Sequence, residues 1–366
     1  MKENQQFVVA MDSFKGCLTS EEAGYAAKKG IVKMLPNASV LVLPLSDGGE
    51  GMMETFCKAL SGHHVNVIIH DPMMRRIKAN YAISGETAII EVAKACGFQL
   101  VSKEERNPLV ATSYGVGEMV VDALKKGCKR FIIGLGGTAT SDGGIGMLKA
   151  LVDMLGEGKN IDFVMKQYLN KCNFVLACDV TNPLCGPTGA AMVFARQKGA
   201  SDSDIKRIEQ RMIKFKDISS KHLGHDYSNM PGAGAAGGLG YAFLEYMNAQ
   251  VKSGADYLLD MVDFDKLVTS AACVITGEGS SDSQTLMGKL PFVVMNRTKC
   301  ISHSIPVWLL SGRISDKSDF LNAGFDKVIC INDMNTNSKD VLKSSVATNN
   351  IELTVEKCIK ESGMSI

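Results

Sequence analysis

Short apolar runs that end in polar turns recur near both ends of the chain. Phe7-Val8-Val9-Ala10 and Val40-Leu41-Val42-Leu43 are each followed by a helical pattern, and Thr19 with Glu22 forms a capping-box sequence before the first helix. The same rhythm returns later, in the apolar runs 272–275, 307–310 and 327–331. Alternating strands and helices indicate a parallel sheet covered by helices. We therefore expect a Rossmann-like α/β domain with a doubly wound parallel sheet, built from residues 1–63 and 262–366.

The middle of the chain, residues 64–261, has a different pattern. Apolar runs at 65–69, 77–83 and 87–92 are separated only by turn residues, which predicts an antiparallel meander. Strand and helix patterns then alternate again, and a charged amphipathic helix over 202–222 is expected to face solvent. These features predict an inserted mixed α/β domain. Because ligands of open α/β sheets bind beyond the carboxyl ends of the strands, we expect the active site in a cleft between the two domains.

Composition narrows the class of protein and its partners. The 366 residues are 45% hydrophobic and 22% charged, which suits a globular protein of roughly two domains. The net charge is +1 and aromatic residues are few, so neither nucleic acid nor an acidic membrane is an expected partner. The 11 cysteines are scattered without a C-x-x-C pair, and no apolar run is long enough to span a membrane. We expect a cytoplasmic protein with reduced thiols.

A glycine-rich run at 134–146 is the most distinctive stretch of the chain. It holds six glycines among thirteen residues, follows an apolar run and precedes a helical pattern. Such a loop exposes backbone N–H groups at the start of a helix, and the hydroxyls of Thr138, Thr140 and Ser141 add polar groups. The run is therefore a candidate cradle for phosphate oxygens, with a tight turn as the alternative.

Half of this run occurs a second time in the chain. Ser46-Asp47-Gly48-Gly49-Glu50-Gly51 resembles Ser141-Asp142-Gly143-Gly144-Ile145-Gly146. Two copies suggest two loops around one polyanionic or polyhydroxylated ligand. Since the first copy falls in the other predicted domain, we expect the loops to face each other across the cleft, with domain closure completing the site.

Acidic residues recur at predicted strand ends or in glycine-rich loops, at Asp12, Asp47, Asp142, Asp179, Glu278 and Asp282. Lysines accompany them at Lys15, Lys198 and Lys289. This combination suits phosphoryl transfer, because carboxylates hold Mg²⁺ or accept a hydroxyl proton and lysines neutralise phosphate charge. The chain has no Walker A sequence, which excludes a P-loop kinase. A loop aspartate more often caps the following turn, and only the recurrence at strand ends favours the functional interpretation.

Eight blocks of sequence follow one another between residue 7 and about 331: DSFKG, SDGGEG, RNPL, GLGGTATSDGGIGML, CDVTNPLCGPTGA, QKGA, PGAGAAGGLG and TGEG-x-x-D-x-Q-T-x-x-G-K-x-P. In content and order they resemble the bacterial type-I glycerate kinase family. The resemblance implies ATP-dependent phosphorylation of D-glycerate, with Mg²⁺ as the metal and ATP and D-glycerate as small-molecule partners. It favours 2-phosphoglycerate over 3-phosphoglycerate as the product and leaves assembly into a homo-oligomer open.

The resemblance points to particular positions, to which we assign roles by their chemistry. Asp179 is the expected proton acceptor, with Asp47 second, and Lys15 and Lys289 are expected to neutralise phosphate charge. Metal ligands are expected at Asp282 and Glu278. Contacts to substrate or phosphate are expected at Asp12, Ser13, Gly48, Gly49, Gly136, Gly137, Thr138, Ser141, Asp142, Asn182, Gly234, Gly237, Gly238, Glu278 and Gln284.

The chain departs from the family pattern at Ser280, at Val293 and in a shorter segment between Leu155 and Asn173. Ser280 stands where the family has an arginine or similar polar residue, and the shorter segment trims a surface excursion. Two alternatives therefore stay open. One is a kinase of another small hydroxy acid or sugar alcohol, because GLGGTA is similar to the GLGSSA loop of homoserine and galactose-type kinases. The other is a ligand-binding homologue with little catalysis.

Overall fold

The structure is a computed structural model that describes residues 5–14, 16–45, 51–332 and 343–363. The chain divides into two compact units, one made of residues 1–47 and 255–366 and the other of residues 48–254. The boundaries expected from the sequence were 63/64 and 261/262, and the compact units change at 47/48 and 254/255.

The first unit is built around a parallel sheet. Among the described residues this sheet has five strands in the order β11-β10-β9-β1-β2, and all neighbouring pairs are parallel. The strands are β1 (Gln6–Met11), β2 (Ser39–Pro44), β9 (Ala271–Glu278), β10 (Val307–Ser311) and β11 (Lys327–Cys330). The chain proceeds from β1 to β2 in one direction and from β9 to β10 and β11 in the other. The order therefore reverses between β1 and β9, which confirms the predicted doubly wound sheet and creates a topological switch point.

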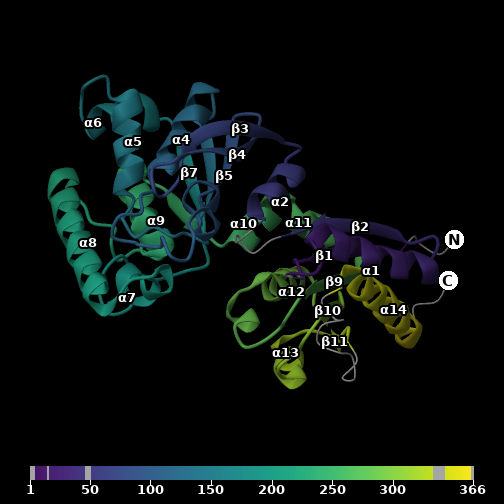
Figure 1. The fold of residues 1–366 in the computed structure, drawn as a ribbon. Coiled ribbons are helices and arrows are strands. Elements are labelled where there is room, and N and C mark those ends of the chain that lie inside the picture. The colour runs from purple at the N-terminus through teal and green to yellow at the C-terminus, as the bar shows by residue number, and fades with distance from the viewer. Residues whose placement is uncertain (1–4, 15, 46–50, 333–342, 364–366) are drawn as a thin grey trace. The chain divides into compact units, whose positions relative to one another are not determined.

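Helices cover this sheet because right-handed crossovers that run in opposite directions place them on opposite faces. The helices are α1 (Ser20–Met34), α10 (Gly254–Met261), α11 (Phe264–Val268), η4 (Thr285–Met287), α12 (Leu290–Ile301), α13 (Lys317–Ala323) and α14 (Ser344–Ser362). α1 begins at the predicted capping box and lies beside α14 (Figure 1). Gly30 permits their close approach, since a Cβ there would lie 2.6 Å from the Glu352 carbonyl oxygen. One core cluster joins both chain ends, with Phe7, Ile31 and Ile351 fully buried.

The second unit also has one sheet, with six strands in the described residues that follow sequence order, β3-β4-β5-β6-β7-β8. The strands are β3 (His63–His70), β4 (Arg76–Ser84), β5 (Thr87–Glu91), β6 (Arg130–Gly134), β7 (Asn173–Ala177) and β8 (Gln250–Lys252). β3, β4 and β5 pair antiparallel, as the predicted meander requires, and β5 through β8 pair parallel. The mixed α/β architecture predicted for the middle of the chain is confirmed.

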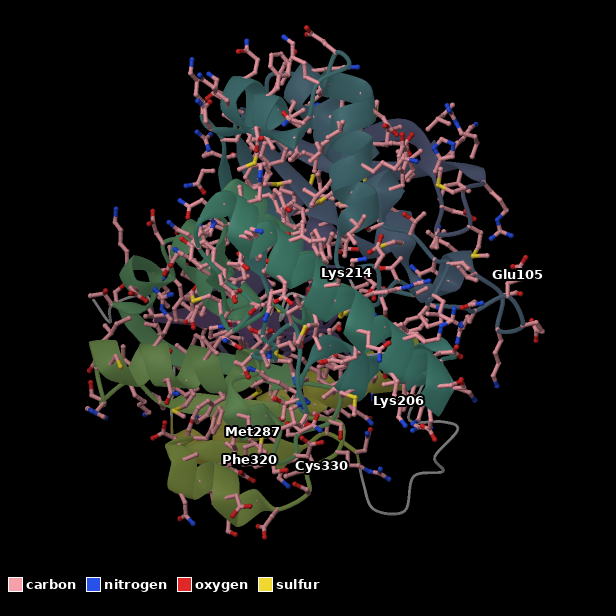
Figure 2. All side chains as sticks on the ribbon, turned by 90° about the vertical axis from the view of Figure 1, so that its left-hand side faces the viewer. Glu105, Lys206, Lys214, Met287, Phe320 and Cys330 are labelled. Atoms are coloured by element: carbon pink, nitrogen blue, oxygen red, sulfur yellow. The ribbon has the colours of Figure 1, made fainter. Side chains whose placement is uncertain are left out.

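Helices of the second unit pack on this sheet and on each other. They are α2 (Met52–Ala59), α3 (Ala93–Cys96), η1 (Phe98–Leu100), α4 (Tyr114–Lys125), α5 (Ile145–Leu155), α6 (Ile161–Val164), the π-helical turn η2 (Met165–Leu169), α7 (Ala190–Phe194), η3 (Arg196–Lys198), α8 (Asp202–Leu223) and α9 (Ala235–Met247). α8 is amphipathic as predicted: Ile205 and Ile208 are buried, while Lys206 and Lys214 are exposed on the helix (Figure 2). No helix in the described part of the chain combines the length and apolar content needed to cross a membrane.

Candidate active site

Parallel strands of the second unit end along one edge of its sheet. β5, β6, β7 and β8 end at Glu91, Gly134, Ala177 and Lys252, and these end residues are paired in register from strand to strand. The segments that follow the strands are therefore neighbours. The glycine-rich run follows β6 and Asp179 follows β7, so the fold brings these two predicted features to the same edge.

The glycine-rich run begins with two residues that reach the surface of the second unit. Gly136 is half-buried and Gly137 is exposed, and Gly137 has a φ of +63°, in the left-handed region that favours glycine. The Gly137 carbonyl accepts a hydrogen bond of 3.0 Å from the Phe98 N–H. Within the described residues, the N–H groups of Gly136 and Gly137 have no acceptor. Consecutive N–H groups of this kind can receive an oxyanion.

Asp142 lies inside this run and holds it in place. Its Oδ2 accepts hydrogen bonds from the N–H and hydroxyl of Ser113, both at 2.8 Å, and from the Gly146 N–H at 3.1 Å. Its Oδ1 accepts one from the Gly144 N–H at 3.1 Å. Both carboxylate oxygens are therefore committed to joining the loop to the starts of α4 and α5, which is the capping role that loop aspartates commonly have.

The glycines of the 232–240 segment allow two backbones to cross closely. Gly237 and Gly238 have φ values of +69° and +86°, and the Gly237 carbonyl accepts a hydrogen bond of 3.0 Å from the Gly143 N–H. A Cβ on Gly237 would lie 2.1 Å from the Thr140 carbonyl oxygen. Glycines of both clusters therefore allow the two backbones to pack closely. From the sequence pattern alone, glycines needed for such packing cannot be distinguished from glycines that bind a ligand.

The loop after β7 contains Asp179 and Asn182. Asp179 is exposed at the end of the strand. The Asn182 side-chain amide donates to the Thr188 carbonyl at 2.8 Å, and the Asn182 backbone carbonyl accepts from the Gly234 N–H at 2.9 Å. A Cβ on Gly234 would lie 2.2 Å from the Pro183 carbonyl oxygen. Asn182 and Gly234 therefore shape the loop that presents Asp179.

Two further residues lie at this edge: Lys198, which the sequence groups with the lysines expected to neutralise phosphate charge, and Arg106, for which no role is predicted. Lys198 is only 2% exposed, and its Nζ donates to the Thr140 carbonyl at 2.6 Å and to the Thr138 hydroxyl at 3.3 Å. Burial lowers the pKa of Lys198 to about 8. The guanidinium of Arg106 lies 5.1 Å from the centroid of the Phe98 ring, and its buried Nε has no partner among the described residues. In the sequence, Lys198 belongs to the QKGA block and Arg106 to the RNPL block, but the burial of these side chains cannot be derived from those blocks.

The start of α2 reaches the same edge. Glu91, at the end of β5, is 5% exposed, and its Oε1 accepts a hydrogen bond of 2.7 Å from the Met53 N–H. The second unit thus positions the residues that directly follow the SDGGEG repeat. Four predicted site residues, Lys15, Asp47, Gly48 and Gly49, lie outside the described residues.

In the first unit, two acidic residues stand at the ends of the neighbouring strands that form the switch point. Asp12 follows β1 and Glu278 ends the neighbouring β9, and the Asp12 N–H donates to the Gly277 carbonyl at 2.8 Å. Asp12 is 5% exposed and Glu278 is 6% exposed. Ser13 is half-buried, and its N–H donates to Asp12 Oδ1 at 2.6 Å. The predicted pair is therefore at the position where ligands bind in such sheets.

Glu278 is held by hydroxyl groups of the following loop. Its Oε1 accepts hydrogen bonds from the Thr285 hydroxyl at 2.6 Å and from the Ser281 hydroxyl at 2.9 Å. Burial raises the pKa of Glu278, and these two hydrogen bonds oppose that shift. A cation at this carboxylate would favour its charged form.

The other predicted residues of this loop are engaged with one another. Asp282 Oδ1 accepts a hydrogen bond of 2.9 Å from the Gln284 N–H and lies 3.9 Å from Lys289 Nζ. Lys289 stands at the N-cap of α12. Of the two family departures in this region, Ser280 is exposed and Val293 is a buried residue of α12.

The described residues contain no cluster of three or more His, Cys, Asp or Glu side chains that could hold a metal ion by themselves. Asp12 and Glu278 nevertheless offer carboxylate oxygens on neighbouring strands. Mg²⁺ is usually bound by one or two carboxylates together with water and phosphate oxygens rather than by a complete protein cage. The donor set at the switch point therefore fits Mg²⁺ shared with a phosphate.

Comparisons with known proteins show what the whole chain is similar to. The sequence profile of the glycerate kinase family matches residues 7–361. The glycerate kinase of Bacillus subtilis is 39% identical over 345 residues, which are 89% of this chain and 90% of that protein. The glycerate 2-kinase of Escherichia coli is 36% identical over 345 residues, with the same two coverages of 89% and 90%. A crystal structure of a protein named glycerate kinase 2 from Salmonella typhimurium superposes with a TM-score of 0.85 at 33% identity, covering 99% of this chain and 100% of that one.

Proposed function

Because the chain belongs to the glycerate kinase family, we propose that it transfers the γ-phosphoryl group of ATP to a hydroxyl group of D-glycerate. The observation that carries this proposal is the carboxyl edge of the second unit, where the N–H groups of Gly136 and Gly137 and the exposed Asp179 follow neighbouring strands. Phosphoryl transfer requires positioned donors for oxyanions and an acceptor for the hydroxyl proton, and this edge supplies both kinds of group.

In this proposal Asp179 accepts the proton of the substrate hydroxyl. As the hydroxyl oxygen forms its bond to the γ-phosphorus, the bond between that phosphorus and the β–γ bridging oxygen breaks, and ADP leaves with the electron pair. Gly136 and Gly137 donate to oxyanions through their N–H groups. Arg106, which has no carboxylate partner in the described part of the chain, pairs with an anionic group of the substrates.

In this proposal the first unit supplies the carboxylates that bind a metal ion and a lysine that neutralises phosphate charge. Asp12 and Glu278 would hold Mg²⁺, which when bound neutralises charge on the phosphate oxygens. Lys289 adds a positive charge at the start of α12.

We further propose that O2 of glycerate is phosphorylated, giving 2-phosphoglycerate. The support is the E. coli relative, which is named a glycerate 2-kinase. Phosphorus NMR of the product formed from D-glycerate and ATP distinguishes the two phosphoglycerates directly. A product phosphorylated at O3 would contradict this part of the proposal. ADP release with other hydroxy acids or sugar alcohols of a test panel, but not with D-glycerate, would contradict the proposal that D-glycerate is the substrate.

Asp179→Asn tests the proton acceptor. Removing a general base lowers turnover by about 10²- to 10⁴-fold, and because Asp179 is exposed, the melting temperature should stay near that of the wild type. Asp217→Asn, at an exposed aspartate of α8, is the matched control and should retain full activity. Wild-type turnover in Asp179→Asn would rule out this assignment.

A further inference from the structure

We propose that Lys198 is a positioning residue of the glycine-rich loop: its ammonium group, buried beneath the loop, holds Thr138 and Thr140 so that the loop receives an anionic group of the substrates. The identity of that group, a phosphate or a carboxylate, rests on the proposed function. The positioning role itself rests on contacts within the second unit.

The burial of Lys198 requires an explanation beyond packing. Its side chain is 2% exposed, and among the described residues it forms no ion pair within 4.0 Å. Burying an ammonium group without a carboxylate partner is costly, whereas a methionine of similar length would fill the same space without that cost. A buried positive charge therefore indicates a use for the charge itself.

The hydrogen bonds of Lys198 act on the inner side of the loop. Its Nζ binds the Thr138 hydroxyl and the Thr140 carbonyl, which lie on either side of Ala139. The Ala139 N–H donates to the Cys96 carbonyl at 2.8 Å, so three successive residues are anchored inward. The outer side of the same loop presents the unpartnered N–H groups of Gly136 and Gly137. Lys198 thus fixes the backbone that carries these donors.

The charge of Lys198 acts through a medium of low dielectric constant. In a buried position a positive charge is screened far less than in water, so it raises the electrostatic potential at the loop surface. An oxyanion bound to the loop would be stabilised by this charge without touching it. This distinguishes the role of Lys198 from that of a residue in direct contact with substrate.

Two ionisable groups influence Lys198 from neighbouring elements, the Cys96 thiol at the end of α3 and the Asp142 carboxylate before α5. Burial raises the pKa of Cys96 to about 12, so this thiol is neutral between pH 7 and 9. Since burial lowers the pKa of Lys198 to about 8, its ammonium form is lost as the pH rises through that value. We expect loop function to weaken over the same range.

Stability should change in the opposite direction over this range. The folded state binds fewer protons at Lys198 than the unfolded state between pH about 8 and 10.5, so the unfolding free energy contributed by this residue increases with pH in that window. This gain follows from the lowered pKa whatever the role of the lysine, so it shows only that Lys198 titrates in this window. The loss of activity over the same window, absent in Lys198→Met, is what the positioning role adds.

The first experiment needs no substrate. Hydrogen exchange of the Ala139 amide, which donates to the Cys96 carbonyl, is compared in the wild type, in Lys198→Met and in the control Lys206→Met, which replaces an exposed lysine of α8 (Figure 2). We expect exchange about tenfold faster in Lys198→Met, because a charge-assisted anchor is lost, and no change in the control. Equal exchange in Lys198→Met and the wild type would overturn the inference.

The second experiment measures kinetics across pH with D-glycerate and ATP. Lys198→Met should lower kcat/KM by about tenfold to a hundredfold. Lys198→Arg should recover part of the lost kcat/KM. It should also move the fall of kcat/KM at alkaline pH from near pH 8 to higher pH, because a guanidinium stays charged. If Lys198→Arg does not fold, Thr138→Val replaces it as the test, because this variant removes one of the two hydrogen-bond acceptors of Lys198. Thr138→Val should lower kcat/KM less than Lys198→Met does, and kcat/KM should still fall near pH 8. An unshifted decline in a folded Lys198→Arg would overturn the inference.

The two experiments separate this inference from the proposed function. A wild type without glycerate phosphorylation, but with exchange that depends on Lys198, would refute the proposed function and leave the positioning role intact. A fully active Lys198→Met with unchanged exchange would refute the positioning role and leave the proposed function intact.

Discussion

At the residue scale, buried ionisable groups mark the two sheet edges. Asp12 and Glu278 are buried at the carboxyl ends of strands in the first unit, and Glu91 and Lys198 are buried at the corresponding edge of the second. Burial raises the pKa of Glu278 and lowers that of Lys198, and perturbed pKa values of this kind are typical of functional sites. The positions of Asp12 and Glu278 were predicted from strand ends, whereas the burial of Lys198 was not.

Glu278→Gln should separate function from stability. Because burial raises the folded pKa of Glu278, this carboxyl favours folding below its unfolded pKa of 4.5, and that contribution is lost as the pH rises through the folded value. The glutamine keeps an oxygen for the Ser281 and Thr285 hydroxyls. We therefore expect Glu278→Gln to have a melting temperature equal to or higher than that of the wild type at pH 7. Its activity should be lower than that of the wild type by about tenfold or more.

Calorimetry at pH 4 and 7 and an Mg²⁺ titration of activity measure these effects. At pH 4 any stability advantage of Glu278→Gln should shrink. Glu104→Gln, at an exposed position, serves as the control. A strongly destabilised Glu278→Gln at pH 7 would show that the carboxylate is primarily structural.

At the element scale, the two glycine clusters of the second unit are one structural feature. The segment around Gly143 crosses the start of α9, where Ala236, Gly237 and Gly238 all have positive φ. Backbones can approach this closely only where no Cβ intervenes. The glycines predicted to contact ligand at 234, 237 and 238 are thus explained by packing, while Gly136 and Gly137 remain at the surface with available donors.

Gly237→Ala tests the crossing, with Gly224→Ala as the matched control. Both glycines have positive φ, at +69° and +78°, but a Cβ on Gly224 meets nothing within 4 Å, whereas one on Gly237 would meet the Thr140 carbonyl at 2.1 Å. The control should lose only the left-handed penalty of about 1–2 kcal/mol. Gly237→Ala should lose about 3 kcal/mol or more, because backbone must shift. Equal losses in urea unfolding would contradict the crossing.

At the scale of the whole molecule, the chain forms two units with separate sheets, and the first is assembled from both chain ends. α1 comes from the start of the chain and α14 from its end, and they share a core with β1, β9 and β10. No described residue of 48–254 belongs to this cluster. The stability of the first unit therefore depends on contacts between segments that are far apart in sequence.

Ile351→Ala should destabilise the first unit. Ile351 is fully buried in α14, so the cavity should cost about 2–5 kcal/mol, whereas Leu353→Ala, half-exposed on the same helix, should cost under about 1 kcal/mol. Hydrogen exchange should report the loss at β1 and β9. If β6 of the second unit lost equal protection, the two units would unfold as one cooperative body.

The hydrophobic pattern by itself predicted the strands other than β8, the meander and the placement of the parallel sheet at both chain ends, and Thr19 with Glu22 predicted the capping box of α1. These features depend on local periodicity and on strand–helix alternation, which sequence records directly. The motifs likewise indicated the family and most positions at the sheet edges. Chemistry at strand ends was predictable because parallel strands bring their carboxyl ends to one edge.

Only the tertiary structure decided which role each of these residues can take. Asp142 and Asn182 proved to be occupied by hydrogen bonds within the protein, and Gly237 by a backbone crossing. Lys198 proved to be buried beneath the loop. Apart from the local Asn182–Thr188 bond, these outcomes depend on contacts between segments about 30 to 100 residues apart. Burial and hydrogen bonding across such separations leave no periodic signal in the sequence.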